Sequence, residues 1–240
     1  LRDSDNPSSV LGAVSIARSN ARLVRTALTR EVWESVNEGW ITLKQALESP
    51  VPNRDLPETL GLIRRQAALV RGALHGTQLR NDGYQFSQLG ISLERASNTA
   101  RIVDMKYYAL LRSGSSMVQS VSNVQWETIL RTVSAHRSYR WLYGGDMAPE
   151  TIARFLILDQ GMPRAILFCT EAAADCLSSL ADMYGRRQPC NELADKLRDD
   201  LRAVSISDIY DQGLKGFTVD VVNRLAGLSR QIEDDYRFYQ

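Results

Sequence analysis

The sequence has no long apolar run and few cysteines. No stretch approaches the roughly 20 apolar residues that a helix needs to span a bilayer. The beginning, LRDSDNPSSV, lacks the charged and then apolar order of a secretory leader. The three cysteines, Cys169, Cys176 and Cys190, form no Cys-x-x-Cys pair, which is typical of a reducing compartment. We therefore expect a cytoplasmic protein that does not associate with membranes.

Histidine is scarce, and the usual nucleotide and metal motifs are absent. Helical bundles often hold metals on Glu-x-x-His pairs, but Gly72 and Val133 stand three residues before His75 and His136. The chain contains no GxxxxGKS or GxxxxGKT, GxGxxG, GxSxG or HExxH segment. The cysteines lie on apolar faces, where small core residues are more common than metal ligands. We therefore expect no metal and no cofactor.

Acidic and basic residues nearly cancel. The formal net charge is +1, from 29 basic and 28 acidic residues, so no overall field attracts nucleic acid or anionic lipid. Only four of the basic residues are lysines, which leaves 25 arginines. A GC-rich genome is the explanation that we favour. The other is a need for planar, bidentate contacts with carboxylates or phosphates, which lysine cannot make.

Apolar residues recur at steps of three and four through nearly every long segment, which is the spacing of one helix face. The first stripe runs from Val10 to Leu28 and continues from Trp33 to Leu47, either directly or after a bend near Thr29. Strand alternation is almost absent. With 44% apolar residues, the 240-residue chain can bury a substantial core. We expect a single α-helical domain over residues 1–240.

Proline-rich and polar segments divide the helical pattern. A helix cannot cross the connector SPVPNRDLP at 49–57, and the polar stretch 113–123 is the longest loop-like segment. Pro149 and Pro163 suit the first turns of two helices. Further stripes cover 60–74 and 89–110, and helices are expected near 124–142, 148–158, 163–185, 190–204 and 217–238. Short connections favour antiparallel neighbours, so the expected fold is an all-α, up-and-down antiparallel helical bundle of about eight helices.

The stretch SLERASNTARIVD, residues 92–104, places polar groups along one line of a helix. At roughly 100° per residue, Glu94, Asn98, Arg101 and Met105 share a narrow sector opposite the apolar stripe. Apolar residues such as Ile102 also border this line. A helix that is apolar on two sides is normally central in a bundle. We therefore expect the line to lie half-buried inside the bundle.

Three interpretations of this line remain open. Partly buried charges must be paired or hydrogen-bonded, because an uncompensated charge out of water costs several kcal/mol. We favour a structural polar network, followed by a binding site for an anionic or peptide ligand, and then by catalysis with Glu94. Similar charged ridges occur on other helices. They comprise Arg18, Arg22 and Arg25; Arg64, Arg71 and His75; and Glu31, Glu34 and Glu38.

Residues 89–111, LGISLERASNTARIVDMKYYALL, resemble the naming motif of the α-E family, bacterial all-helical proteins with a Glu-Arg motif in a helix. The naming pair is matched by Glu94 and Arg95, and its continuation by Asn98, Arg101, Asp104 and Tyr107. Segments 18–37, 125–140 and 155–169 match the family in the same order. Charged residues of these segments join the candidate site set, namely Arg18, Arg22, Glu31, Glu34, Asp159 and Arg164.

Two departures from the family pattern occur. The last segment has Met162 and Ala165 where the family usually has an aromatic residue and a serine flanking Pro-Arg. Nothing before Leu11 matches the family's earlier Glu-Arg helix. We therefore expect that helix to be missing from this chain. A site that it completes would then be incomplete.

The resemblance implies a role in peptide ligation or modification, because members of the family are encoded beside circularly permuted ATP-grasp ligases and transglutaminase-like proteins. Our leading hypothesis is a non-catalytic accessory protein that docks an ATP-grasp ligase or positions its peptide substrate. The alternative is an enzyme of that pathway in which Glu94 acts as acid or base, steadied by Arg95 or Arg101. A nucleic-acid binder is the weakest hypothesis, because acidic residues balance the arginines. A homo-oligomer remains open.

Overall fold

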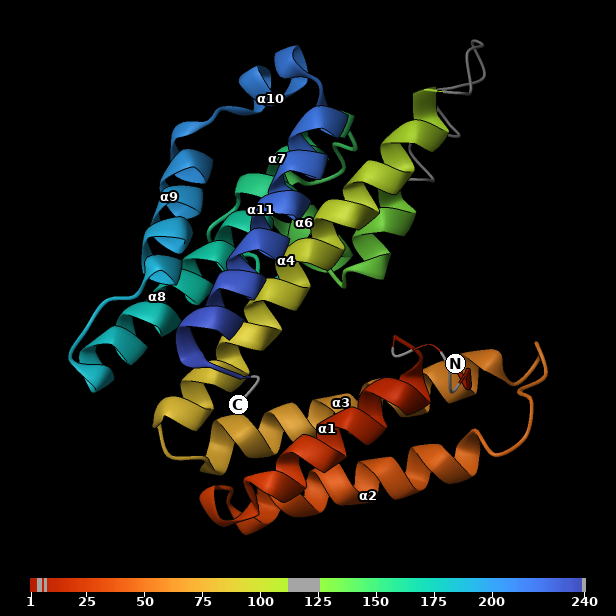
Figure 1. The fold of residues 1–240 in the computed structure, drawn as a ribbon. Coiled ribbons are helices and arrows are strands. Elements are labelled where there is room, and N and C mark those ends of the chain that lie inside the picture. The colour runs from red at the N-terminus through yellow and green to blue at the C-terminus, as the bar shows by residue number, and fades with distance from the viewer. Residues whose placement is uncertain (4–5, 7, 112–125, 239–240) are drawn as a thin grey trace. The chain divides into compact units, whose positions relative to one another are not determined.

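The computed structural model describes residues 1–3, 6, 8–111 and 126–238, with the side chains of 106–111 outside the description. Within these ranges the chain forms helices but no strand, so the predicted all-α class is confirmed. The helices, drawn in Figure 1, are α1 (Val10–Leu23), η1 (Arg25–Ala27), α2 (Arg30–Ala46), α3 (Leu56–Thr77), α4 (Asp82–Leu111), α6 (His136–Tyr143), α7 (Pro149–Leu158), α8 (Ile166–Tyr184), α9 (Pro189–Ala203), α10 (Ile206–Gln212) and α11 (Leu214–Tyr236). A further helix covers residues 126–132.

The described residues contain eleven α-helices, so the bundle arrangement is confirmed but the predicted count of about eight is wrong. Three local features account for the difference. The first predicted helix is divided at the 3-10 helix η1, after which Thr29 caps α2. The helix predicted over 124–142 is interrupted after residue 132, where Ser134 has a φ of 58°. The short α10 occupies a segment for which no helix was predicted.

The first of two compact units, Leu1–Tyr84, contains α1, α2 and α3. The hydroxyls of Ser9 and Thr29 accept hydrogen bonds from backbone N–H groups three residues later, at 3.0 and 3.3 Å, and so satisfy donors at the starts of α1 and α2. The buried Gln78 follows α3 and holds the turn between α1 and α2. Its side chain accepts from the Thr29 N–H at 3.2 Å and donates to the Ala27 carbonyl at 2.8 Å.

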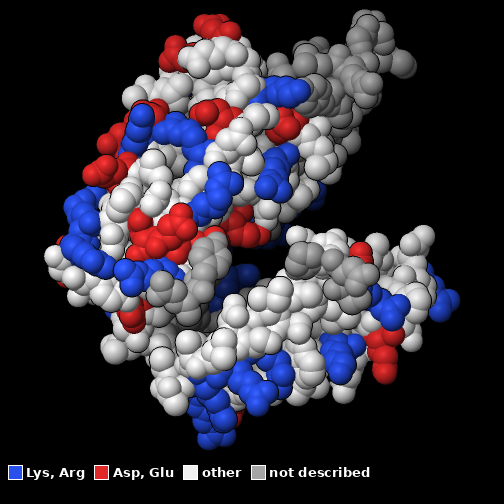
Figure 2. Space-filling model, in the orientation of Figure 1, with Lys and Arg blue, Asp and Glu red and all other residues white. Residues whose placement is uncertain are grey.

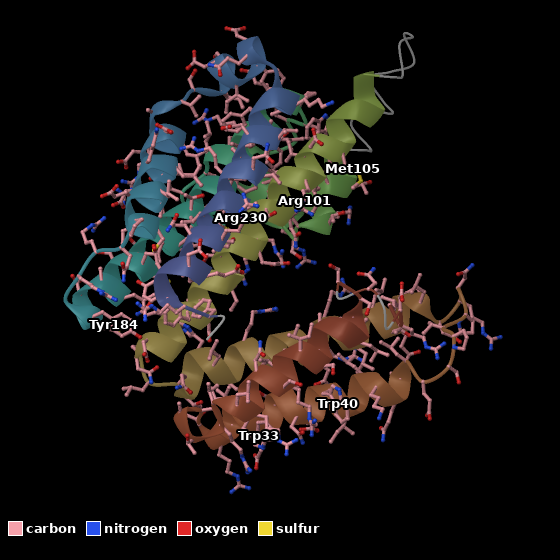
Figure 3. All side chains as sticks on the ribbon, in the orientation of Figure 1. Trp33, Trp40, Arg101, Met105, Tyr184 and Arg230 are labelled. Atoms are coloured by element: carbon pink, nitrogen blue, oxygen red, sulfur yellow. The ribbon has the colours of Figure 1, made fainter. Side chains whose placement is uncertain are left out.

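Two tryptophans of α2 hold arginines from the predicted ridge of the first helix (Figure 3). The guanidinium of Arg18 lies 4.3 Å from the ring centroid of Trp40, and that of Arg25 lies 5.1 Å from Trp33. Arg18 Nε also donates to Asn37 Oδ1 at 2.7 Å. These arginines therefore pack against α2, and α1 itself has no fully buried residue.

Replacing Trp40 by alanine is expected to loosen α1. The ring holds the guanidinium of Arg18 in α1, and such a contact contributes roughly 0.5–1 kcal/mol at an exposed site, so amide protection in α1 should fall about two- to fivefold. Hydrogen exchange resolved by peptide measures this change. Trp141→Ala, at a side chain that is 85% exposed in the second unit, is the control and should leave α1 unchanged. Equal amide protection of α1 in both variants would contradict the role of Trp40 in holding α1 against α2.

The second unit, Gln85–Gln240, is organised around α8. Its buried residues cover about half of the circumference of the helix, at roughly 100° per residue, and comprise Ile166, Leu167, Cys169, Thr170, Ala173, Ala174, Cys176, Leu177, Leu180 and Ala181. This buried face is wider than the stripe of roughly 100° that is usual for a surface helix, so α8 contributes a large part of the core. The helix α9 packs along α8, and α11 packs along α9 (Figure 1). None of the described helices, α8 included, has the length and apolar content to cross a membrane.

The three cysteines are buried in this unit, which confirms the prediction that they are core residues. Burial raises the pKa of Cys169 and of Cys176 to about 11 and the pKa of Cys190 to about 12. Their thiols therefore stay protonated at neutral pH, as expected for packing residues and not for nucleophiles.

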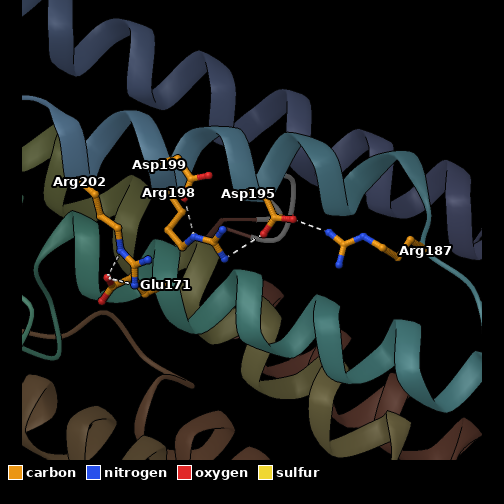
Figure 4. A network of polar contacts seen from close by, with 6 residues as sticks. All are labelled: Glu171, Arg187, Asp195, Arg198, Asp199 and Arg202. Atoms are coloured by element: carbon orange, nitrogen blue, oxygen red, sulfur yellow. Dashed lines mark hydrogen bonds and ion pairs between the residues drawn. The ribbon is translucent and has the colours of Figure 1, made fainter.

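Ion pairs cover the junction between α8 and α9 (Figure 4). Arg202 contacts Glu171 at 2.7 Å, and Asp195 lies between Arg187 and Arg198, the latter at 2.9 Å. Acidic and basic side chains are likewise interspersed over the visible face of this unit (Figure 2). On this face, therefore, acidic and basic side chains lie next to one another, and neither sign of charge forms a large patch.

Candidate functional site

The polar line of α4 is one face of the helix, but this face is exposed. Asn98 Nδ2 donates to Glu94 Oε1, so the predicted sharing of one face is confirmed. Glu94, Asn98, Arg101 and Met105 are all exposed, and Met105 retains 66% of its accessible surface (Figure 3). The prediction that the line lies inside the bundle is therefore wrong.

The physical reason lies in the opposite face of α4. Ala96, Ala100 and Val103 are fully buried there, whereas the flanking Ile91 and Ile102 are only half-buried at the margins. Apolar residues on both sides of a polar line can thus belong to the two edges of a single buried face on the opposite side of the helix. They do not require two separate packing surfaces. The exposure of Glu94 also removes the desolvated setting on which the acid–base hypothesis depended.

The Glu-Arg pair nevertheless lies beside the Pro-Arg segment. Burial raises the pKa of the Cys169 thiol to about 11, and the guanidinium groups of Arg95 and Arg164 partly oppose this rise. The carboxylate of Glu94 raises the same pKa. Arg95 of α4 and Arg164 of the turn before α8 therefore lie near enough to the Cys169 thiol to influence its pKa, although 69 positions separate them in the sequence.

A buried threonine joins α4 to this segment. Thr99 is 1% exposed, and its hydroxyl donates to the backbone carbonyl of Arg164 at 2.8 Å. Thr99 was not among the predicted site residues. A signal was present, because Thr99 is a polar residue within the apolar stripe that contains Ala96 and Ala100. Such a residue needs a hydrogen-bond partner outside its own stripe.

Replacing Thr99 by valine is expected to lower the free energy of unfolding of the second unit by about 1–3 kcal/mol, because the Arg164 carbonyl loses its donor in a part-buried setting. Urea denaturation followed by circular dichroism measures the change. Thr132→Val is the matched control, since the exposed Thr132 only bonds the carbonyl four residues earlier in its own helix. Similar losses in both variants would argue against the link between α4 and the turn.

Asp159 shapes the turn between α7 and α8. Its Oδ1 accepts hydrogen bonds from the backbone N–H groups of Gly161 and Met162, at 2.9 and 2.8 Å. This side-chain turn delays α8, which begins at Ile166, so the prediction that a helix opens on Pro163 is wrong. The prediction for Pro149 is confirmed, because α7 begins there. Asp159 is therefore a structural residue of the turn.

A groove of about 890 Å³ opens between α6, α7 and this turn, and we call it the turn groove. From α6 it is lined by Arg137, Ser138, Trp141 and Leu142; from α7 by Phe155; and from the turn by residues 159–163. Trp141 is 85% exposed and Leu142 is 50% exposed. Among the described residues, no carboxylate lies within ion-pair distance of the exposed Arg137 guanidinium.

Edge-to-face contacts between aromatic rings support the floor of the turn groove. Phe155 is 1% exposed, and its ring centroid lies 5.4 Å from that of Tyr139 and 5.8 Å from that of Tyr143. Burial raises the pKa of Tyr139 to about 12, so its hydroxyl is neutral at physiological pH. The floor is therefore aromatic and uncharged, with one guanidinium at its edge.

The remaining predicted site residues have separate roles. Asp104 of α4 accepts a hydrogen bond from the buried Thr218 of α11 at 3.3 Å. Tyr107 lies outside the described side chains. In the first unit, Glu34 pairs with Arg30 at 2.6 Å, whereas Arg22 and Glu31 are exposed. In the described parts of the chain, no three His, Cys, Asp or Glu residues are grouped as a metal site.

The lining of the turn groove can hold the apolar side chains of a ligand beside a carboxylate of that ligand.

The comparisons with known proteins agree with the resemblance in the helix α4. The model of the Alpha-E family, described as a predicted alpha-helical domain with a conserved ER motif, matches residues 1–237. No curated protein and no solved structure matches the chain. Because the family model covers nearly the whole sequence, the chain belongs to the Alpha-E family.

Proposed function

We propose that the protein is a helical accessory protein that positions a peptide substrate for an ATP-grasp-associated peptide ligation or modification system. The observation that carries this proposal is the turn groove, with its exposed Trp141 above the apolar floor and the Arg137 guanidinium at its edge. A transglutaminase-like protein is the second partner in this proposal.

The size and lining of the turn groove suit part of a peptide. Its volume of about 890 Å³ falls in the range of roughly 300–1,000 Å³ that is usual for ligand sites. Tryptophan and arginine are the residue types most enriched at the energetic centres of protein interfaces. Trp141 and Leu142 expose apolar surface at the rim, and an apolar patch of this kind is typical of an interaction site.

The turn groove has one arginine, Arg137, and one aspartate, Asp159, so its charge suits a single peptide carboxylate better than a phosphate-rich ligand. Arg137 is the one guanidinium in the lining, and it can form two parallel hydrogen bonds with a carboxylate. The backbone N–H groups of Gly161 and Met162 are already bonded to Asp159. A segment with an apolar side chain next to a carboxylate therefore fits this lining best.

In this proposal, the helix α4 that carries the Glu-Arg motif stabilises the turn that forms one wall of the groove. Thr99 bonds the Arg164 carbonyl at the end of the turn whose earlier residues form one wall of the groove. The motif helix α4 thus acts as a structural support, and its exposed line remains available to a partner protein. The resemblance of this chain to a family whose members are encoded beside ATP-grasp ligases supports the choice of partner.

A binding measurement tests this proposal. The substrate peptide of the neighbouring ATP-grasp ligase, labelled with a fluorophore, is titrated with the full chain while anisotropy is recorded. We expect micromolar binding that strengthens when the ligase is present, because two linked contacts then hold the peptide. Absence of binding at high micromolar concentrations, with and without the ligase, would refute the proposal.

A further inference from the structure

The first unit carries a second groove, of about 750 Å³, between α2 and α3. We propose that this groove docks a cationic amphipathic helix of a partner protein. Its α2 wall carries Glu31, Glu34 and Glu38, and its α3 wall includes Ala68, Leu69 and Gly72. We call it the acidic groove. It belongs to another unit of the chain than the turn groove, so this inference does not depend on the proposed function.

The α3 wall of the acidic groove is small and apolar. Leu69 is 59% exposed, and Ala68 is also exposed beside it. A Cβ built on Gly72 would meet nothing within 4 Å, so open space continues over this turn of the helix. Small residues let another helix approach closely, and an exposed leucine offers it an apolar contact.

The α2 wall carries the negative charge. Glu31, Glu34 and Glu38 follow the spacing i, i+3, i+7 and therefore form a ridge about 10 Å long at roughly 1.5 Å per residue. Glu34 pairs with Arg30, but both side chains are largely exposed, at 54% and 82%. Glu31 and Glu38 have no cation within ion-pair distance in the described part of the chain. The lining also includes Arg65, which is on the α3 wall.

The first unit also buries little apolar surface of its own. Its buried apolar side chains are Val32, Leu43, Leu47, Leu74 and Tyr84. Its large apolar side chains that are at least half exposed are Ile16, Leu23, Val24, Leu69 and Leu79. A unit of this size has a marginal core, and burial of apolar surface by a bound partner stabilises it.

The chemistry of the two walls defines the partner. An anionic membrane or a nucleic acid is repelled by the glutamate ridge. A helix with apolar residues at i and i+4 can contact Leu69 with one face, while lysines or arginines beside that face meet Glu31 and Glu38. This is the helix-in-groove mode of recognition with charge complementarity on one wall.

The experiment uses the full chain and two synthetic helical peptides as probes. One peptide combines leucine with lysine, with leucines on one face, and the other has glutamate in place of every lysine. Fluorescence anisotropy should detect binding of the lysine peptide alone, and added salt should weaken this binding. The double variant E31Q/E38Q should bind it about fivefold more weakly, as expected for two exposed ion pairs. Leu69→Ala should weaken it further by removing the apolar contact.

The matched control is E48Q/E58Q, which removes two charges from the same unit. Each pair includes one glutamate of a first helical turn, Glu31 in α2 and Glu58 in α3, so the effects on the helix ends are matched. Circular dichroism verifies that both double variants are folded. Equal weakening by the two pairs, or equal binding of the two peptides, would overturn the proposal. Loss of a self-associated state in E31Q/E38Q alone, measured by sedimentation, would overturn it in favour of a second copy of this chain.

Discussion

Replacing Phe155 by alanine is expected to lower the free energy of unfolding of the second unit by about 3–5 kcal/mol. The ring is 1% exposed and packs against Tyr139 and Tyr143, so its removal leaves a cavity under the turn groove. Urea denaturation followed by circular dichroism gives the change in free energy. Because the chain has two units, the transition of the second unit is followed by tryptophan fluorescence in a W33F/W40F background, in which the remaining tryptophans, Trp126 and Trp141, both lie in the second unit.

The control for this prediction is Leu193→Ala on α9. Leu193 is 43% exposed, so the loss of its side chain should change the free energy by less than about 1 kcal/mol. A similar small change for Phe155→Ala would mean that α7 does not pack on α6 as described. The aromatic floor of the groove would then have to be abandoned.

Replacing Trp141 by alanine is expected to weaken peptide binding by about 30-fold or more, the loss typical of a tryptophan that anchors an interface. The side chain is 85% exposed, so the thermal unfolding temperature should stay within about a degree or two of the parent value. The anisotropy titration with the labelled substrate peptide measures the affinity. A loss of affinity without a loss of stability separates a binding role from a structural one.

Met183→Ala is the comparison for Trp141→Ala. Met183 is 47% exposed on α8 and does not line the turn groove, so its replacement should leave the peptide affinity unchanged. If the two variants bind the peptide equally well, the exposed tryptophan has no role in recognition. The proposed site would then be wrong even if the chain binds the peptide elsewhere.

The helical class and many helix positions follow directly from the sequence. Apolar spacing places α2, α3, α4 and α11, and Pro149 marks the start of α7 because its missing N–H costs nothing in a first turn. How much of a helix is buried does not follow from spacing. Apolar residues border the polar line of α4, which is nevertheless exposed, whereas α8 buries about half of its circumference.

The candidate site could be predicted only in part. Helix geometry correctly places Glu94 and Asn98 on one face of α4. Periodicity cannot tell whether a polar face that is bordered by apolar residues on both sides is exposed or buried. The groove residues of α6 were missed because residues 124–142 read as one helix. The positive φ of Ser134 breaks this helix and redirects α6, so Arg137 and Trp141 reach the turn. A positive φ at a serine has no clear sequence signal.

Hydrogen exchange tests most directly whether the turn groove holds the peptide. The full chain is compared with and without the proposed partner ligase and the peptide substrate of that ligase, and exchange is resolved along the sequence. We expect added peptide to slow exchange in α6 and in residues 159–163, the segments that line the groove. Unchanged exchange in both segments, with protection confined to other surfaces of the chain, would contradict it.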